Sequence, residues 1–384
     1  MPTDLQTRPF KDFKLVFVHL GKAPVEHLWL NMKSVLGRFP SLEVVFISDR
    51  EHPQLPVDPR VKFFKYLRSD STQEIFQNLA HDSKFRSGFW QFTLERFLAL
   101  NDYHELNQNL RILHIESDIL LLPGLPFEEI SNTNNLAWQR VDENRDIASL
   151  FFSPTYSETA WFAKELLNLI SENAEITDMT ALNRIRSHHP NRIKIFPSYS
   201  VRLGSNLVCE GTKGEALIHD LSQNSEEFKG IFDPAAYGMW LTGSDPRNYY
   251  GKQIAFDTKE LIKGGTYLDP SKFEYSFSDN GELFCRFGES QVRIWSLHIH
   301  SKDFQLLGES WLPRLHRLVR ISGSGHVFVE FHFSTFLRLI RSNFGDKTML
   351  SWVLHIPKLR LLFRFLLGIR RTIRDVLNYD NEAA

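Results

Sequence analysis

The stretch 110–127, LRILHIESDILLLPGLPF, decides how this sequence is interpreted. It is an apolar run suited to a buried strand, yet it carries two carboxylates, Glu116 and Asp118, two positions apart. An ionised carboxylate is costly to bury unless it is paired, hydrogen-bonded or bound to a metal ion. The run therefore predicts a buried strand that ends in a functional acidic site.

The spacing of the two acids predicts where their side chains point. In an extended strand, side chains two positions apart face the same side. We therefore expect Glu116 and Asp118 to share one cleft, with Ser117 turned away. Oxygen ligands of this kind suit Mg²⁺ or Mn²⁺, and one or two carboxylates plus substrate phosphates form a typical magnesium shell. The alternative is that the strand ends at Glu116 and both acids are merely solvated.

Apolar runs nearer the N-terminus indicate a parallel sheet. Three of them read as strands, namely FKLVFVHLGKAP, LEVVFISD and VKFFKYL. The first ends at Gly21, the second ends at Asp49, and a helical segment at 25–36 separates them. Strands that alternate with helices indicate a mostly parallel sheet covered on both faces. Ligands bind beyond the carboxyl ends of such strands, where Gly21 and Asp49 fall.

Periodicity predicts the later elements. Helices are expected at 87–106, 157–173 and 175–190, and strands at 135–141, 146–154 and 291–304. Ser157 is the expected N-cap of the second helix, with Glu158 in its first turn. A break at 176–178 is expected to precede the third helix. A looser region rich in Gly, Asp and Tyr then runs to about Asn280.

The stretch 231–248, IFDPAAYGMWLTGSDPRN, combines aromatic rings with carboxylates. Sugars present apolar ring faces edged by hydroxyl groups, so such surfaces suit them. Asp233, Tyr237, Trp240 and Asp245 are therefore candidates for sugar or acceptor contact, with Asp233 foremost. The alternative is a short core helix in which Trp240 is packing.

Composition bounds the class of protein. The chain of 384 residues can bury one large domain, with or without an appendage. Its two cysteines, Cys209 and Cys285, exclude a disulfide scaffold and a cysteine-rich zinc site, which favours a reducing compartment. The first residues lack the apolar core of a signal peptide, so we expect a place in the cytosol or on the cytosolic membrane face.

The C-terminal segment has a different character. Between 311 and 374 the chain carries twelve Lys and Arg against two acids, although the formal net charge of the whole is -1. At the helical period an apolar face opposes an arginine face, formed by Arg360, Arg364, Arg371 and Arg374. Such a helix suits the interface of an anionic membrane, and the arginines exclude a membrane span. The alternative is a helix packed on the domain or on a second subunit.

Several motifs resemble those of nucleotide-sugar glycosyltransferases with the GT-A fold, in the family's order. HIESDILL resembles the Asp-x-Asp element, with Asp118 in the place of the metal ligand and Glu116 in the first position. VVFISD resembles the strand whose last Asp approaches the nucleobase or ribose, which gives Asp49 that role. FTLERFLALND resembles the helix whose Arg reaches toward the nucleotide, and Arg96 is the match.

Two further motifs resemble the retaining, glycogenin-like branch. ITDMTALN resembles its Asn-Asp-Gln element, so that Asp178 would contact the donor sugar, although Thr177 and Met179 replace the usual neighbours. SLHIHSK resembles the late element in which a His completes the metal shell and a Lys neutralises phosphate. Either His298 or His300 is the counterpart of that His, and Lys302 is the counterpart of that Lys. The retention of configuration stays open.

The resemblance implies a domain at 11–305 with a mixed, mostly parallel sheet flanked by helices, and the charge pattern predicts a basic amphipathic helical appendage at 306–384. The resemblance implies a metal-dependent transferase that moves a sugar from a nucleotide-diphosphate donor, UDP-sugar favoured. The basic appendage favours a glycan or glycolipid acceptor in polysaccharide or lipid-linked glycan synthesis. The resemblance gives a catalytic role to Asp178, the aromatic and acidic stretch gives one to Asp233, and Glu116 is expected to be a partner of Asp118 rather than an equal ligand. The alternatives are a sugar-phosphate nucleotidyltransferase and a non-catalytic membrane-associated binding protein. Nucleic-acid binding is disfavoured, because the basic residues alternate with bulky apolar ones.

Overall fold

The computed structural model describes residues 12–21, 26–77, 79–80, 88–204, 215–242, 270–278 and 280–300. The basic C-terminal segment, Lys302 and Asp245 lie outside these residues, and so do the parts 205–214 and 243–269 of the looser region. The division of the chain at 305 therefore stays a prediction.

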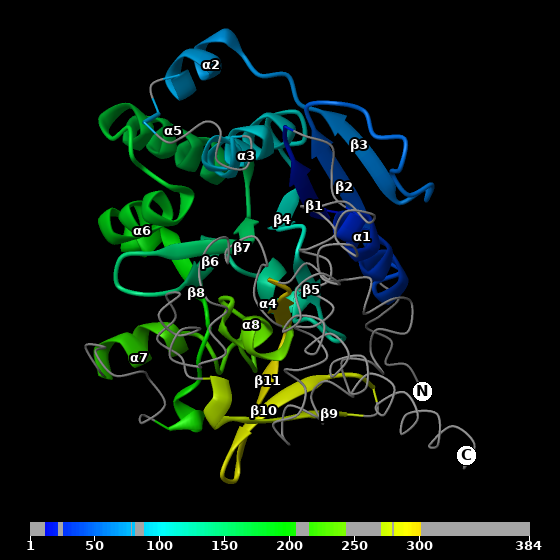
Figure 1. The fold of residues 1–384 in the computed structure, drawn as a ribbon, viewed down its shortest axis with the longest axis vertical. Coiled ribbons are helices and arrows are strands. Elements are labelled where there is room, and N and C mark those ends of the chain that lie inside the picture. Colours follow the sequence, from blue (N-terminus) through cyan, green and yellow to red (C-terminus); the bar gives the residue numbers. More distant parts are fainter. Residues whose placement is uncertain are drawn as a thin grey trace, which may run out of the picture.

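A seven-stranded sheet forms the centre of the molecule, with the strand order β3-β2-β1-β4-β7-β6-β8 (Figure 1). Its strands are β1 (Phe13–His19), β2 (Glu43–Ser48), β3 (Val61–Lys65), β4 (Arg111–Ile115), β6 (Leu136–Arg140), β7 (Asp146–Ser153) and β8 (Ile193–Phe196). The pairs β2·β3, β1·β2, β1·β4 and β6·β8 are parallel, whereas β7 runs antiparallel to both its neighbours. The predicted mixed, mostly parallel sheet is confirmed.

Helices cover both faces of this sheet (Figure 1). They are α1 (Glu26–Arg38), α2 (Asp70–Gln77), α3 (Phe89–Glu105), α4 (Phe127–Ser131), α5 (Tyr156–Glu172) and α6 (Asp178–His188). Successive residues of a strand point to opposite faces. In β4, Ile112 packs in the cluster that contains α3, α5 and α6, while Leu113 and Ile115 pack in the cluster that contains α1 and α4. Burial on both faces explains why apolar residues predominate in the central strands.

The stretch 110–127 is not one strand, and that prediction is wrong. β4 ends at Ile115, a turn occupies 116–118, and β5 (Ile119–Leu121) then pairs antiparallel with β12 (Ser296–His298) in a separate two-stranded sheet. One continuous strand would have carried both carboxylates along the buried sheet. The turn instead moves them to its edge, because the chain leaves the large sheet there.

The late strand expected at 291–304 is also two strands. β11 (Ser290–Ile294) joins β9 (Glu274–Phe277) and β10 (Leu283–Phe287) in an antiparallel sheet, and β12 follows after Trp295. The N–H of Trp295 donates to the carbonyl of Ile231 at 2.8 Å, and its carbonyl accepts from Leu122 at 2.9 Å. The break lets one segment serve two sheets.

The region expected to be loose contains regular elements in its described part. They are β8, α7 (Glu215–Ser222), α8 (Ala236–Thr242) and β9. Of these, α7, α8 and β9 enclose a third apolar cluster with β5 and β10, which includes Tyr199, Tyr237 and Cys285. Short elements held by such distant contacts leave little periodicity in the sequence.

Two helix starts test the capping predictions. The N-cap of α5 is Thr155, not Ser157, because its side chain accepts from the N–H of Glu158 at 3.4 Å. Glu158 lies in the first turn, as expected. α6 begins at Asp178 after the predicted break, and Thr177 forms a capping box with Thr180.

Candidate functional site

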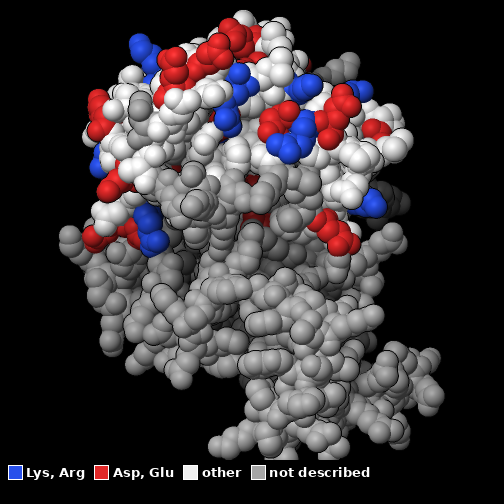
Figure 2. Space-filling view, turned by 45° about the horizontal axis from the view of Figure 1, so that its top comes forward, with Lys and Arg blue, Asp and Glu red and all other residues white. Residues whose placement is uncertain are grey.

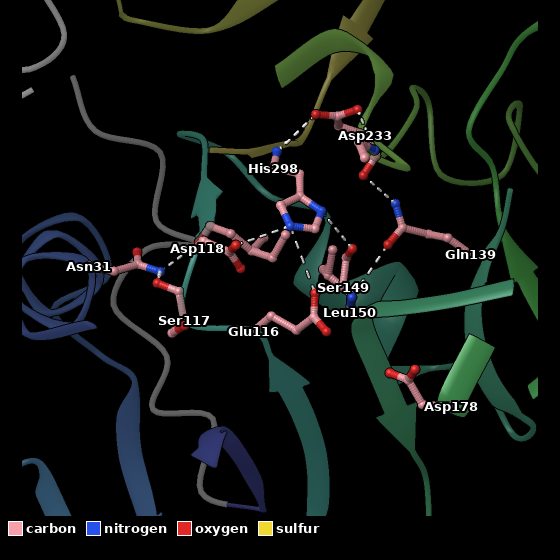
Figure 3. A network of polar contacts seen from close by, with 12 residues as sticks. Asn31, Glu116, Ser117, Asp118, Gln139, Ser149, Leu150, Asp178, Asp233 and His298 are labelled. Carbon is pink, nitrogen blue, oxygen red and sulfur yellow. Dashed lines mark hydrogen bonds and ion pairs between the residues drawn. The ribbon is translucent and has the colours of Figure 1, made fainter. Parts of the chain in front are cut away.

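Hydrogen bonds to backbone carbonyl groups hold the acidic turn 116–118 on both sides (Figure 3). Asn31 of α1 donates from Nδ2 to the carbonyls of Ser117, at 3.1 Å, and Ile119, at 2.8 Å. On the other side, the N–H of Ile299 donates to the carbonyl of Asp118 at 2.7 Å. These bonds fix the backbone on both sides of Asp118 and so restrict the directions in which its side chain can point.

Glu116, Asp118 and His298 point toward one another (Figure 3). One ligand atom from each lies within 4.8 Å of the others. His298 Nε2 is 3.2 Å from Asp118 Oδ2 and 3.9 Å from Glu116 Oε2. Two carboxylate oxygens and one imidazole nitrogen at these separations fit a divalent cation such as Mn²⁺ or Mg²⁺. The expectation that the two acids share one cleft holds, although a turn rather than a strand brings it about.

A hydrogen bond at the ring nitrogen that faces away from the two acids orients the imidazole of His298. Its Nδ1 lies 3.2 Å from Oγ of Ser149, a residue of β7. A partner on one ring nitrogen sets the tautomer and directs the other nitrogen to the ligand position. His298 is 5 % exposed. Of the two candidate histidines, His298 is the one that joins the acids, and the ring of His300 lies beside it with 4.2 Å between centroids.

Asp233 is fully buried and its carboxylate is engaged by backbone. Oδ1 accepts from Ala235 at 2.8 Å and Tyr237 at 3.0 Å, and Oδ2 accepts from Gly238 at 2.6 Å and His298 at 2.8 Å. Burial raises the pKa of Asp233, and the N–H group of His298 opposes that rise. These contacts join α8 to β12. They lend no support to a contact between this carboxylate and a sugar, so its catalytic role stays a prediction.

The packing around Asp233 is close. A Cβ atom on Gly238 would overlap the carbonyl of His298, so only glycine fits there. Gln139 of β6 donates from Nε2 to the carbonyl of Asp233 at 2.7 Å and accepts from the N–H of Leu150 at 3.3 Å. Tyr237 is fully buried in α8, which agrees with the alternative of a short core helix.

Arg96 of α3 joins two of the predicted site acids. One guanidinium nitrogen pairs with Oε1 of Glu116, and the other pairs with Oδ2 of Asp178 at 2.9 Å. Burial would lower the pKa of Arg96, but Glu116 and Asp178 outweigh it and raise that pKa. Burial raises the pKa of Asp178, and Arg96 opposes the rise. The guanidinium expected to reach toward a nucleotide thus lies between two carboxylates.

Gly21 and Asp49 meet at the carboxyl ends of β1 and β2, and β1 lies between β2 and β4 in the sheet. The N–H of Gly21 donates to Oδ2 of Asp49 at 3.3 Å. Burial would raise the pKa of Asp49, but the hydrogen bond and charge of Arg50 and the N–H of Gly21 together outweigh burial and lower that pKa. Gly21 has a φ of 86°, and a Cβ there would overlap the ring of Phe92. The position therefore requires glycine.

Three residues of the site were not predicted. Asn31, Ser149 and Gln139 contact the site residues from other elements. Their partners lie far along the chain, 149 positions away in the case of Ser149 and His298. No local pattern marks such residues, because their role depends on how the sheets meet.

On the face shown in Figure 2, the described Lys and Arg side chains are interspersed with Asp and Glu, so charges of both signs are mixed there. In the part of the chain that the structure describes, no helix is both long and apolar enough to cross a membrane.

Comparisons with known proteins give distant likenesses only. No protein-family model matches the chain, and no curated protein matches it in sequence. Among solved structures, the galactosyltransferase LgtC in complex with donor and acceptor sugar analogs is 12 % identical, with a TM-score of 0.32 over 50 % of this chain and 74 % of that one. The apo form of the glycosyltransferase GlyE of Streptococcus pneumoniae TIGR4 is 14 % identical, with a TM-score of 0.35 over 48 % of this chain and 44 % of that one. We therefore base the function on the geometry of the site.

Proposed function

We propose that this chain is a glycosyltransferase of the GT-A type that uses a divalent cation and a nucleotide-diphosphate sugar. The observation that carries the proposal is the meeting of Glu116, Asp118 and His298 at the carboxyl edge of the sheet. Carboxylates with one imidazole suit Mn²⁺ or Mg²⁺, and phosphate oxygens complete such shells. The site lies where ligands of parallel α/β sheets bind.

The residues divide the work between them. Asp118 and His298 would hold the cation, with Glu116 Oε2 beside them. A bound cation would supply electrostatic stabilisation of the charge on the departing nucleoside diphosphate. Asp178 would orient the donor sugar through hydroxyl contacts.

The nucleoside end of the donor would fall to Gly21 and Asp49, which follow β1 and β2, the first and second strands from β4. Lys302, two residues beyond the described segment, would neutralise phosphate. A glycan or glycolipid acceptor hydroxyl would attack the anomeric carbon, and the stereochemistry of transfer is left open by these contacts.

Calorimetry tests the proposal. The protein is titrated with UDP-sugars and GDP-sugars, with and without Mn²⁺. We expect binding that needs Mn²⁺, with UDP-sugars favoured, followed by slow donor hydrolysis. Absence of metal-dependent binding to any of them contradicts the proposal. Binding without hydrolysis and without transfer to any glycan would instead favour a binding protein, and transfer of the nucleotide to a sugar phosphate would favour a nucleotidyltransferase.

The basic segment at 306–384 would hold the enzyme at an anionic membrane surface on its cytosolic side. Arginines that oppose an apolar face support this role, since each basic residue near such a surface contributes about 1 kcal/mol. Deletion of residues after 323 should leave donor hydrolysis measurable and release the protein from anionic liposomes in a sedimentation assay. A truncated protein that still sediments with them refutes the membrane role.

A further inference from the structure

Arg96 is a buried cation in the middle of an acidic site. Its side chain is 9 % exposed, and its two ion-pair partners, Glu116 and Asp178, are 18 % and 9 % exposed. The Nε atom is buried and has no hydrogen-bond partner among the described residues. The guanidinium is therefore held chiefly by the two acids, and it compensates charge that would otherwise be buried unpaired.

The same charge lies beside the expected cation position. Glu116 offers one carboxylate oxygen to Arg96 and the other toward His298, so one side chain faces both. Asp118 also acts on Arg96 electrostatically. Like charges this close repel each other appreciably when they are shielded from water. A divalent cation that enters the free protein thus meets a site in which Arg96 already compensates part of the negative charge of Glu116, Asp118 and Asp178.

We propose that Arg96 is the internal counter-ion of this site and keeps its affinity for a divalent cation low until a nucleoside diphosphate arrives. The inference rests on the proposed function and adds to it an order of binding, in which tight cation binding requires the nucleoside diphosphate. The diphosphate brings negative charge that can compensate the cation and Arg96 together. Cation and nucleotide therefore raise each other's affinity by the same factor, as linkage requires.

The structure offers a matched control for the removal of this arginine. Arg186 of α6 pairs with the fully buried Asp146 through Nε at 2.6 Å, and Asp146 belongs to no described metal-ligand group. Arg96→Gln and Arg186→Gln each leave a buried carboxylate uncompensated. Both variants should melt at a lower temperature than the wild type in EDTA. Mn²⁺ should restore the melting temperature of Arg96→Gln, because the ion replaces the lost charge, and should not restore that of Arg186→Gln.

Calorimetry with Mn²⁺ alone measures the effect directly. Arg96→Gln should bind Mn²⁺ at least about tenfold more tightly than the wild type in the absence of nucleotide. Arg96→Lys, which keeps the charge, should bind it no more tightly than the wild type. Weaker or unchanged Mn²⁺ binding by Arg96→Gln overturns the inference and makes Arg96 a residue that only orients Glu116.

Two further comparisons separate the possible failures. If Arg96→Gln does not fold, Arg96→Gln/Asp178→Asn is compared with Asp178→Asn, and the double variant should bind Mn²⁺ more tightly. UDP should raise the Mn²⁺ affinity of the wild type more than that of Arg96→Gln. A wild type that binds UDP equally with and without Mn²⁺ contradicts the proposed function itself. Mn²⁺-dependent UDP binding by the wild type, without the gain in Arg96→Gln, contradicts only the counter-ion.

Discussion

Two arginine–carboxylate clusters among the described residues, one around Asp146 and one around Arg96, differ in how completely the acid is satisfied. In the closed cluster, Asp146 accepts from Trp138 at 2.9 Å, from Asn183 at 3.1 Å and from Arg186 at 2.6 and 3.2 Å. Its carboxylate is fully buried and surrounded by donors. Such an arrangement holds β7, β6 and α6 together and offers no position to a ligand.

In the open cluster, Arg96 pairs with Glu116 and Asp178, yet Glu116 turns its second oxygen toward His298 at 3.9 Å. That oxygen faces an imidazole and a further carboxylate, that of Asp118. The difference teaches that an arginine–carboxylate pair indicates a ligand site only when one carboxylate oxygen is not used by the arginine and points toward other possible ligand atoms. The following predictions test this distinction.

The largest effect on stability is expected in the closed cluster. Asp146→Asn removes the charge that compensates Arg186 and costs about 3 kcal/mol of the free energy of unfolding. Urea denaturation measures this loss. Mn²⁺ affinity, measured on the folded variant by calorimetry, should stay at the wild-type value. A loss of Mn²⁺ affinity together with unchanged stability would reverse the roles of the two clusters.

A smaller effect on stability, with a specific effect on the metal, is expected at Asp233. Asp233→Asn replaces one acceptor oxygen by an NH₂ group, so the backbone N–H groups of Gly238 and His298 lose their partner. We expect a loss of about 2 kcal/mol in stability and a fall of about tenfold or more in Mn²⁺ affinity, because His298 shifts. If Asp233→Asn binds Mn²⁺ as the wild type does and loses only donor transfer, Asp233 acts on the sugar, as the sequence predicted.

The smallest effect is expected at the start of α6, the helix that carries Asp178 at its first turn and Arg186 near its end. Thr177→Ala removes the N-cap and costs about 1 kcal/mol. Hydrogen exchange should rise in the first turn, near the open cluster, and stay unchanged around Arg186. Ser157→Ala in α5 is the matched control, with an effect of a few tenths of 1 kcal/mol, because Thr155 is the cap there. Equal losses in the two variants would contradict the cap assignments.

The parallel part of the sheet could be predicted because β1, β2 and β4 are largely buried and helices α1 and α3 separate them from other strands. The residues at its carboxyl edge, Gly21, Asp49 and the acidic pair, followed from where those strands end. The turn at 116–118 could not be predicted, because β5 leaves the large sheet only to pair with β12, 177 residues later by the pairing of Leu120 with Leu297. Sequence periodicity does not report such a partner.

Within the site, the candidate ligands could be predicted and the residues that support them could not. Asp118 stood out because a carboxylate in an apolar run needs a reason, and the late histidines stood out because SLHIHSK resembles a family motif. Asn31 and Ser149 did not, because polar residues of this kind are common and their partners come from other elements. Asp233 was prominent by type as well, but its four backbone hydrogen bonds became visible only in three dimensions.

The central claim is that Asp118 is a metal ligand through which a nucleoside diphosphate binds. Titration of UDP into the wild type and Asp118→Asn, each with and without Mn²⁺, tests it most directly, with the melting temperature in EDTA as the check on folding. We expect Mn²⁺ to raise the UDP affinity of the wild type by at least about a hundredfold. The UDP affinity of folded Asp118→Asn should be the same with and without Mn²⁺. Equal Mn²⁺-dependent binding by the two proteins would contradict the account and place the cation elsewhere.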